Sequence, residues 1–449
     1  MASSRKWRPD PLDAARAALA RHAAPGSRLA LGLSGGLDSV VLLDILCTLA
    51  GPLRFHLSAI HVHHGLSPRA DEWAQFCAEL CRARGVELTT AKVAVDPASG
   101  QGLEAAAREA RYRAFAQVDA DYVVLAHHRD DQAETLLLQL LRGAGPAGLA
   151  AMPVAGAPRP CAGPRLLRPL LAVPRSALED YAQARALAWV EDDSNADLHR
   201  DRNFVRHRVV PLLEEHFPGA RETLARACAL QAEAARLQEA LARVDGAGAV
   251  GPERLCLGRL RELDAARARN LLRHFLAWHG VPPLSARRLE EALRQLLEAR
   301  RDAAVAVPLD GRQLRRYRDT AWLVTPVPLP AGTQTGIQWR GERWLPLPWG
   351  GVIELEPTKG VGISAARLRQ GAVMVRLRQG GERLQPDCRR PRRTLKNLLQ
   401  EACIPPWERD GLPLLTCDGE VVWVPGLGVD CRYRCSPWED GVNPRWVRS

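Results

Sequence analysis

The sequence has few lysines, few aromatic residues and no closely spaced cysteine pair. Of its 62 basic residues only four are lysines, and Phe, Trp and Tyr together make up 5% of the 449 residues. The eleven cysteines include no Cys-x-x-Cys pair, the spacing that common zinc and redox sites use. We therefore expect free thiols in a reducing cytosol rather than a zinc site or a disulfide framework.

Long apolar runs are missing as well. No run approaches the roughly 20 residues of a membrane-spanning helix, and the basic N-terminal stretch lacks the apolar core of a secretory signal. These absences predict a soluble cytoplasmic protein with no membrane partner. The chain instead carries a net charge of +11, with a pI of about 9.4, which favours an anionic partner such as nucleic acid.

The first half of the chain alternates short apolar runs with helical patterns. This alternation is typical of an α/β fold with a doubly wound parallel sheet that has helices on both faces. We expect strands at Leu29–Leu33, Leu57–Val62, Leu88–Val95, Tyr122–Ala126 and Leu166–Leu171, and helices at Val40–Leu49, Ala70–Arg84, Leu103–Val118, Asp131–Arg142 and Arg175–Leu187.

The composition changes twice further along the chain, and its length predicts about three domains. After residue 217 the sequence is rich in Ala, Leu, Arg and Glu, which predicts a helical run from 220 to about 301. A hairpin follows, with its turn at Asp310-Gly311, and then a Pro-rich linker from Thr325 to Gly336. We expect domains at 1–217, 218–325 and 326–449, the last being a linker and a small β-rich domain.

The stretch SGGLDS, Ser34–Ser39, joins the first expected strand to the first expected helix. Glycines at such a junction expose backbone N–H groups to an anion, and the helix adds its positive N-terminal end. A Gly-Lys pair is absent, so the loop is not a Walker A motif. The less specific interpretation is a tight turn with Ser and Asp as helix caps.

Three further motifs belong to the same expected domain. HVHHGL places His61 at the end of the second strand, as a ligand-facing edge, a structural turn or, less favoured, a metal site. AHHRDDQAET places Asp131 and Glu134 on one face of a helix start, where carboxylates can hold Mg²⁺ or accept a proton from an amine. The alternatives for Asp131 and Glu134 are that they cap the helix or that they belong to a dinuclear phosphohydrolase site.

Two arginine-rich motifs complete the set. LEAAAREARYRAF carries Glu104, Arg108 and Arg111 at near-helical intervals, which suits either anion recognition or a solvated charged face. EDDSNADLHRDRNFVRHR starts at Glu191. Beside the other motifs its polar residues suggest part of a site: Asp193, Asn195, Arg202, Asn203 and Arg206.

These motifs, in this order, resemble the tRNA(Ile)-lysidine synthases, a family within the PP-loop ATP pyrophosphatases. SGGLDS alone resembles only the superfamily; the later motifs narrow the resemblance to one family. Near the C-terminus, MVRLRQGGERL, LKNLLQEACIPPWERDGLPLL and GLGVD are similar to the family's last domain. The sequence departs from the family's pattern at a few places, such as LGVD and the Pro/Trp-rich run before it, and these differences affect only the expected tRNA contacts.

The resemblance implies a carbon–nitrogen ligase. ATP would adenylate the C2 oxygen of the wobble cytidine, position 34, in tRNA(Ile) with a CAU anticodon. The ε-amine of L-lysine would then displace AMP and leave lysidine. Another PP-loop enzyme, such as a cytidine thiolase, is the nearest alternative, although thiolases generally need paired cysteines. A catalytically inactive RNA-binding protein is the second alternative.

The resemblance also implies roles for individual residues. ATP would be held by Ser34, Gly35, Gly36, Leu37, Asp38 and Ser39, together with His61. Asp38, Asp131, Glu134 and Arg108 would be catalytic, with Asp38 and Asp131 as Mg²⁺ ligands. Arg111, Arg202 and Arg206 would bind substrate.

Two basic segments would bind tRNA. These are Leu314–Arg318 (LRRYR) and Arg376–Lys396, which holds eight basic and two acidic residues. The sequence leaves a homodimer open.

Overall fold

The computed structural model describes residues 9–95, 103–156, 163–192, 197–300, 303–326 and 336–448. The chain forms two compact units, residues 1–240 and 241–449. Most of the expected linker, Thr325–Gly336, lies outside the described residues. Within the described ranges, no helix combines the length and apolar character that crossing a membrane requires.

A six-stranded sheet forms the centre of the first unit, in the order β3-β2-β1-β4-β6-β5. The first five strands in this order are parallel, and only the short β5 at the edge is antiparallel. This arrangement confirms the expected parallel sheet. The strands are β1 (Arg28–Gly32), β2 (His56–His63), β3 (Glu87–Lys92), β4 (Tyr122–Val124), β5 (Ala155–Gly156) and β6 (Arg165–Leu167).

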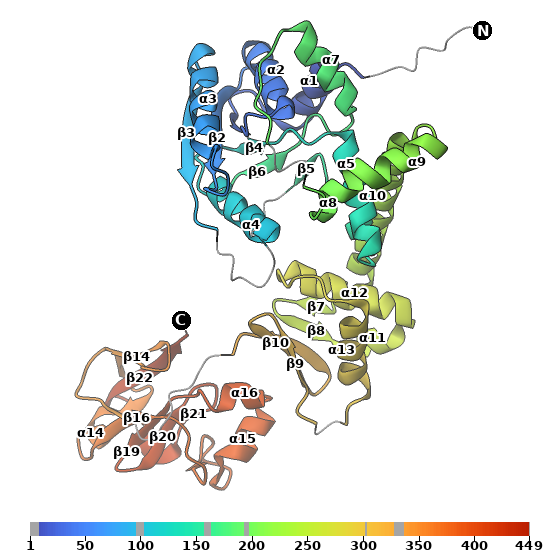
Figure 1. The fold of residues 1–449 in the computed structure, drawn as a ribbon. Helices are drawn as coiled ribbons and strands as arrows, with labels where there is room; N and C mark the ends of the chain where they lie inside the picture. The colour runs from blue at the N-terminus through green and yellow to red at the C-terminus, as the bar shows by residue number, and fades with distance from the viewer. Residues whose placement is uncertain are drawn as a thin grey trace. The chain divides into compact units, whose positions relative to one another are not determined.

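Alternate residues of the strands enter two different cores. Leu29 and Leu31 pack in one core with residues of α2 and α3, whereas Ala30 packs in the other with Phe115 of α4. Helices therefore cover both faces, as Figure 1 shows, and the doubly wound prediction is confirmed. These helices are α1 (Pro11–His22), α2 (Leu37–Leu53), α3 (Ala70–Ala83), α4 (Leu103–Ala116) and α7 (Arg175–Ala184).

Two details of this unit differ from the prediction. Helix α1, which begins at the cap Asp10 and Pro11, was not expected. Strand β6 ends at Leu167 rather than at Leu171. Its next N–H, that of Arg168, bonds to the carbonyl of Val154, and Pro169 has no N–H to continue the ladder.

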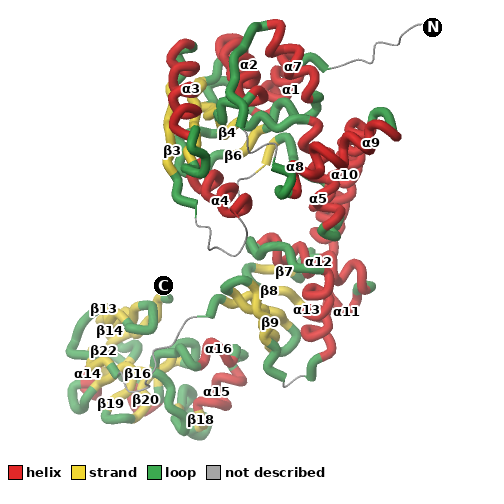
Figure 2. The backbone as a smooth tube through the Cα atoms, in the orientation of Figure 1, coloured by secondary structure: helices red, strands yellow, loops and turns green. Residues whose placement is uncertain are grey.

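Further helices follow along the chain, and Figure 2 shows them in red beside the yellow strands. Residues 201–216 form one uninterrupted helix whose middle turn, Val205–Val209, is a π turn. The elements are α5 (Arg129–Leu141), α6 (Pro146–Leu149), α8 (Asp201–Phe204), η2 (Val205–Val209), α9 (Val210–His216) and α10 (Ala220–Asp245).

The second unit begins with a five-stranded sheet in the order β7-β8-β11-β10-β9. The expected unbroken helical run is wrong here, because β7 and β8 form a hairpin after Gly246 and Gly248. The hairpin at Asp310-Gly311 is confirmed. The elements are β7 (Val250–Gly251), β8 (Arg254–Cys256), α11 (Leu257–Glu262), α12 (Ala265–Trp278), α13 (Ala286–Glu298), β9 (Ala306–Leu309), β10 (Arg312–Tyr317) and β11 (Thr320–Val324).

Residues 336–448 form the expected β-rich region, with sheets β12-β16-β19-β20-β21, β13-β14-β22-β15 and β17-β18. Its strands are β12 (Ile337–Gln338), β13 (Trp344–Pro346), β14 (Val352–Lys359), β15 (Ile363–Ser364), β16 (Val373–Arg376), β17 (Arg383–Leu384), β18 (Arg393–Thr394), β19 (Leu414–Cys417), β20 (Glu420–Val424), β21 (Gly428–Val429) and β22 (Asp440–Val447). The helices are α14 (Ala365–Leu368), α15 (Leu395–Glu401), α16 (Pro406–Arg409) and the 3₁₀ turn η3 (Cys431–Tyr433).

The prediction that the cysteines are free thiols is wrong for one pair. Cys388 and Cys431 form a disulfide, whereas the other eight described cysteines are free. The two residues are 43 positions apart, and tertiary contacts bring their segments together. Spacing along the chain therefore could not reveal the pair.

Candidate active site

The SGGLDS loop lies between the end of β1 and the start of α2. Gly35 has φ of +85°, and a Cβ there would lie 2.9 Å from Cγ2 of Val190 and 3.2 Å from the sulfur of Cys77. Only glycine fits this position without strain. Gly36 has an ordinary φ of −74° and is the N-cap of α2, with no side chain to cap the first N–H groups. The start of the helix therefore offers its N–H groups to an anion.

The two serines of the loop bond to each other and to its backbone. Their hydroxyl oxygens are 3.1 Å apart, and the Ser39 hydroxyl donates to the carbonyl of Gly36 at 2.9 Å. The N–H of Gly36 donates to the Ser34 hydroxyl at 3.4 Å. These bonds hold the loop in one shape before any ligand arrives.

Asp38 lies in the first turn of α2, next to the AHHRDDQAET motif. One carboxylate oxygen is 3.7 Å from Nε2 of His128, and the other oxygen is buried without a hydrogen-bond partner. Burial raises the pKa of Asp38, although His128 and Arg175 act in the opposite direction. An unpartnered buried carboxylate oxygen is costly, which indicates a site for a cation or a donor group.

Asp131 and Glu134 in α5 are bonded to two arginines from the helix at 201–216. Glu134 accepts from Nε of Arg202 at 2.9 Å and from Nε of Arg206 at 2.6 Å. Asp131 accepts from Nη2 of the same two arginines at 2.9 and 3.1 Å. The other oxygen of Asp131 caps α5 through the N–H of His128, at 3.0 Å. The two motifs therefore form one network of charge-assisted hydrogen bonds.

This network determines whether the two carboxylates can accept a proton. Burial opposes ionisation of Asp131, but interactions with His128 and Arg202 outweigh it and hold the pKa of Asp131 well below its usual range. Such a carboxylate is a weak proton acceptor near neutral pH. Glu134 is only 2% exposed and does not line the cleft described below. Its contacts suit a residue that positions the arginines.

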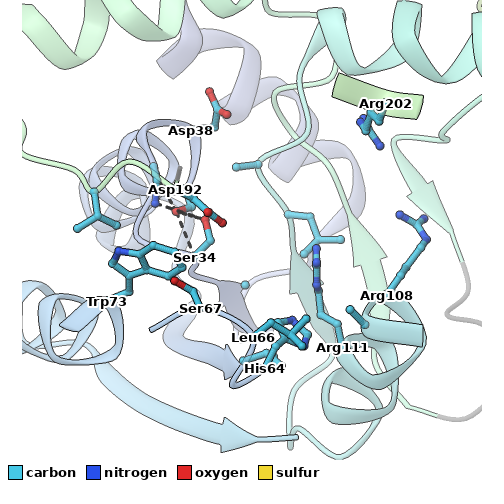
Figure 3. Close-up of a pocket in the computed structure, with 18 of the residues that line it drawn as sticks. Ser34, Asp38, His64, Leu66, Ser67, Trp73, Arg108, Arg111, Asp192 and Arg202 are labelled. Carbon is cyan, nitrogen blue, oxygen red and sulfur yellow. Dashed lines mark hydrogen bonds between the residues drawn. The ribbon is translucent and has the colours of Figure 1, made fainter. Parts of the chain in front are cut away.

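A cleft of about 1580 Å³ lies beside the loop at the carboxyl ends of the strands. Its volume exceeds that of an ordinary small-molecule site, so it has room for more than one reactant. Figure 3 shows Ser34, Ser67 and Trp73 on one side, with Arg108, Arg111 and Arg202 on the other. The predicted residues that line it are Ser34, Gly36, Leu37, Asp38, Ser39, His61, Arg108, Arg111, Asp131, Arg202 and Arg206.

The histidines of HVHHGL point to different partners. Nδ1 of His61 lies 2.9 Å from the carbonyl of Leu33 and fixes the end of β1, whereas Nε2 of His63 lies 3.1 Å from Asp71. Burial, with help from Arg111, lowers the pKa of His64 to about 4, so this ring is neutral at physiological pH. The three rings do not converge on one point.

The α4 arginines and several unpredicted residues also face the cleft. Arg108 donates to the hydroxyl of Tyr112 at 3.3 Å and lies over its ring. His127, Trp73, Arg142 and Arg175 line the cleft but were not predicted individually. His127 belongs to the motif AHHRDDQAET, so a histidine at the end of a predicted strand was the signal that could have identified it as a site residue. Of the other predicted residues, Asp193 and Asn195 lie outside the described residues, as does the side chain of Glu104.

One carboxylate of the site fits Mg²⁺ better than the other. Among the described residues, no cluster of three or more His, Cys, Asp or Glu side chains is placed to hold a metal ion. The unpartnered oxygen of Asp38 fits a cation that takes its other ligands from phosphate oxygens and water, as Mg²⁺ commonly does. Asp131 fits less well, because Arg202, Arg206 and a backbone N–H occupy its oxygens.

Comparison with known families covers most of the chain. Residues 12–213 match a PP-loop domain, 255–322 a TilS substrate binding domain, and 373–446 a TilS substrate C-terminal domain. A tRNA(Ile)-lysidine synthase of Nitrosomonas europaea is 44% identical over 94% of this chain and 92% of its own length. The chain belongs to the tRNA(Ile)-lysidine synthase family. The resemblance found in the sequence is confirmed.

Further relatives agree with the tRNA(Ile)-lysidine synthase assignment. The proteins of that name from Azoarcus sp. and Aromatoleum aromaticum are each 44% identical, over 94% and 96% of this chain and 92% and 100% of their own lengths. The PP-loop domain matched in this family is an ATP-binding domain, and it contains the SGGLDS loop and the whole cleft. ATP is therefore the co-substrate that this domain is built to hold.

Proposed function

We propose that this protein joins the ε-amine of L-lysine to C2 of the wobble cytidine in tRNA(Ile) with a CAU anticodon, using ATP. Family membership supports the reaction. The observation in the structure that supports it most is one cleft lined both by the anion-binding loop at Ser34–Ser39, which includes Asp38, and by Asp131, Arg202 and Arg206 of the acid–arginine network. A nucleotide site and a second, charged site within one cavity suit a two-step ligation.

The first step forms the adenylate. The cytidine C2 oxygen attacks the α-phosphorus of ATP, the α–β phosphoric anhydride bond breaks, and pyrophosphate leaves. The N–H groups at the start of α2 and the hydroxyls of Ser34 and Ser39 hold the phosphates. Arginines that line the cleft, such as Arg108 and Arg175, offset the charge that develops on the pyrophosphate.

The second step joins lysine to C2 and releases AMP with the former C2 oxygen. A free lysine amine has an ordinary pKa near about 10.4, so deprotonation at neutral pH costs roughly 4–5 kcal/mol. Transfer of the ammonium from water into the cleft would lower its pKa and offset part of this cost. Because Asp131 is a weak base and Asp38 is the proposed Mg²⁺ ligand, neither is assigned as the proton acceptor; the ammonium would release its proton to water before the attack.

The other assignments follow from position. The free oxygen of Asp38 would hold Mg²⁺, which would neutralise phosphate charge when bound. Arg108 and Arg111 would meet an anionic group, either the lysine carboxylate or a phosphate of the RNA. Asp131 would face the lysine, and Glu134 would position Arg202 and Arg206.

We also propose the larger organisation. Residues 1–217 carry the chemistry, while 218–325 and 326–449 hold the tRNA through their arginines. We propose a cytoplasmic location, where ATP and tRNA are both present. A homodimer stays a prediction. A cytidine thiolase is disfavoured, because the sequence has no Cys-x-x-Cys pair to carry sulfur.

The test is incorporation of labelled lysine into unmodified tRNA(Ile) bearing CAU, with ATP present and then omitted. We expect label only with ATP, together with one AMP per lysine. Asp38→Asn would remove the carboxylate that holds Mg²⁺ and should lower AMP formation about a hundredfold or more. The matched control Asp13→Asn, which changes an exposed carboxylate of α1, should have no effect. AMP formation without label would point to a different nucleophile, and label without ATP would refute the adenylate step.

A further inference from the structure

The disulfide between Cys388 and Cys431 lies within the C-terminal β-rich region, far along the chain from the active-site residues. Their Cα atoms are 5.5 Å apart. Cys388 is exposed, and Cys431 begins the 3₁₀ turn η3 and is half-buried. A cysteine at an exposed position is open to attack by a small thiol or disulfide in solution.

Non-covalent bonds hold the two cysteine segments together independently of the sulfurs. The carboxylate of Asp430, which is fully buried, accepts from the N–H of Gln385 at 3.0 Å, and the N–H of Cys431 donates to the carbonyl of Gln385 at 2.9 Å. Nη1 of Arg392 lies 3.2 Å from the same carboxylate. These bonds keep the sulfurs adjacent after reduction, so the pair can close again without refolding.

The disulfide also lies inside the most basic segment of the chain, Arg376–Lys396. Cys388 directly precedes Arg389 and Arg390, which are both exposed. Arg390 makes an ion pair with Asp387 at 3.6 Å, and both of these groups are largely exposed, so this pair contributes little to order. The bond to Cys431 is therefore the covalent restraint on the loop that presents these two arginines.

We propose that Cys388 and Cys431 form a reversible thiol–disulfide site that controls the affinity of this basic segment for tRNA. The inference rests on the proposed tRNA substrate. With the bond closed, the loop is restrained covalently before RNA binds; with the bond open, only hydrogen bonds such as Gln385 to the carbonyl of Arg390 hold it, and RNA binding has to restrict its remaining motion. Disulfides in the cytoplasm are uncommon and usually transient, which fits a regulatory bond rather than a structural one.

Glutathione disulfide is the class of oxidant that closes the bond. One cysteine thiolate attacks a sulfur of glutathione disulfide, which forms a mixed disulfide and releases one glutathione thiolate. The second cysteine thiolate then attacks the protein sulfur, which closes the Cys388–Cys431 bond and releases the second glutathione. Two electrons pass from the protein to the glutathione pair, and the reverse exchange with reduced glutathione opens the bond.

The first measurement is chemical and needs no tRNA. The full-length protein is equilibrated with oxidised and reduced glutathione, free thiols are alkylated, and peptides are mapped by mass spectrometry. We expect a linked peptide pair containing Cys388 and Cys431 that disappears with excess reductant. If both cysteines are alkylated under oxidising conditions, the inference is refuted.

The second measurement is tRNA affinity by filter binding, in the oxidised and reduced states. Reduction of the wild type should weaken binding about three- to tenfold, the cost of ordering one or two long side chains. Cys388→Ser and the double serine variant should bind like the reduced wild type in both states. Cys403→Ser, which removes an exposed free thiol of the same region, should respond like the wild type.

The outcomes separate the two proposals. A linked peptide with equal tRNA affinity in both redox states refutes the redox control and leaves the proposed function intact. Absence of tRNA binding in every state refutes the proposed substrate, and this inference with it. Thermal melts of the serine variants check that they fold.

Discussion

Replacing Gly35 by alanine tests whether the nucleotide loop depends on one left-handed glycine. An alanine at φ of +85° costs about 1–2 kcal/mol. Its Cβ would lie 2.9 Å from Val190 and 3.2 Å from Cys77, and such overpacking costs about 1–3 kcal/mol. The loop should therefore open more easily by about 2–5 kcal/mol. Because about 1.4 kcal/mol is a factor of ten, amide protection should fall by roughly 30-fold or more.

Gly36→Ala is the matched control. Gly36 has an ordinary φ, and a Cβ there would meet nothing closer than 3.6 Å, the hydroxyl of Ser34 in the same loop. Its effect should stay below about 1 kcal/mol. Hydrogen exchange followed by mass spectrometry on the peptide Leu29–Leu46 measures both variants, with peptides from 373–446 as an internal reference. Equal protection in the two variants would refute the argument from backbone geometry.

Three further predictions concern charge. Arg206→Ala leaves Glu134 and Asp131 with fewer partners in a buried site and should lower the free energy of unfolding of the first unit by about 3–5 kcal/mol, measured in urea. The control Arg200→Ala removes a partly exposed ion pair and should cost less than about 1 kcal/mol. Equal losses of unfolding free energy in the two variants would contradict this. Because the pKa of Asp131 is lowered by folding, its stabilisation is present above about pH 4 and is lost as the pH falls through the folded value. Asp131→Asn should therefore flatten the acid limb of stability against pH, and an unchanged limb would argue against an ionised Asp131. Truncation after residue 325 should weaken tRNA binding about tenfold or more with little change in ATP affinity; unchanged tRNA affinity would assign the C-terminal region another role.

Elements with a strong local signal could be predicted from the sequence. Four of the five parallel strands, β1, β2, β4 and β6, contain a short apolar run, whereas β3 (ELTTAK) is largely polar; the glycines of SGGLDS predict the turn after β1. The two-residue strands β5 and β7 have no such signal, because partner strands rather than propensity define them. The edge strand β5 and the β7–β8 hairpin were missed for that reason.

The sequence predicted which residues belong to the site, but it did not predict which of them bond to one another. Asp131, Glu134, Arg202 and Arg206 all belong to motifs that were singled out. That the arginines bond to both carboxylates depends on how two helices far apart in the sequence pack together. The sequence therefore suggested free carboxylates, whereas the structure pairs Asp131 and Glu134 with arginines and leaves one oxygen of Asp38 without a hydrogen-bond partner. The disulfide was not predicted either, because it too depends on how segments far apart in the sequence pack together.

The π turn at Val205–Val209 makes the arginine side of the cleft sensitive to chain length as well as to residue identity. A π turn holds about one residue more than an α turn, and it lies between the two helical segments of residues 201–216. Deleting a single codon there could restore a regular α-helix with little loss of helical hydrogen bonding. The flanking segments would keep their relative orientation, but the residues inside the turn, Arg206 among them, would change position relative to Glu134. This part of the enzyme is therefore sensitive to small deletions as well as to point substitutions.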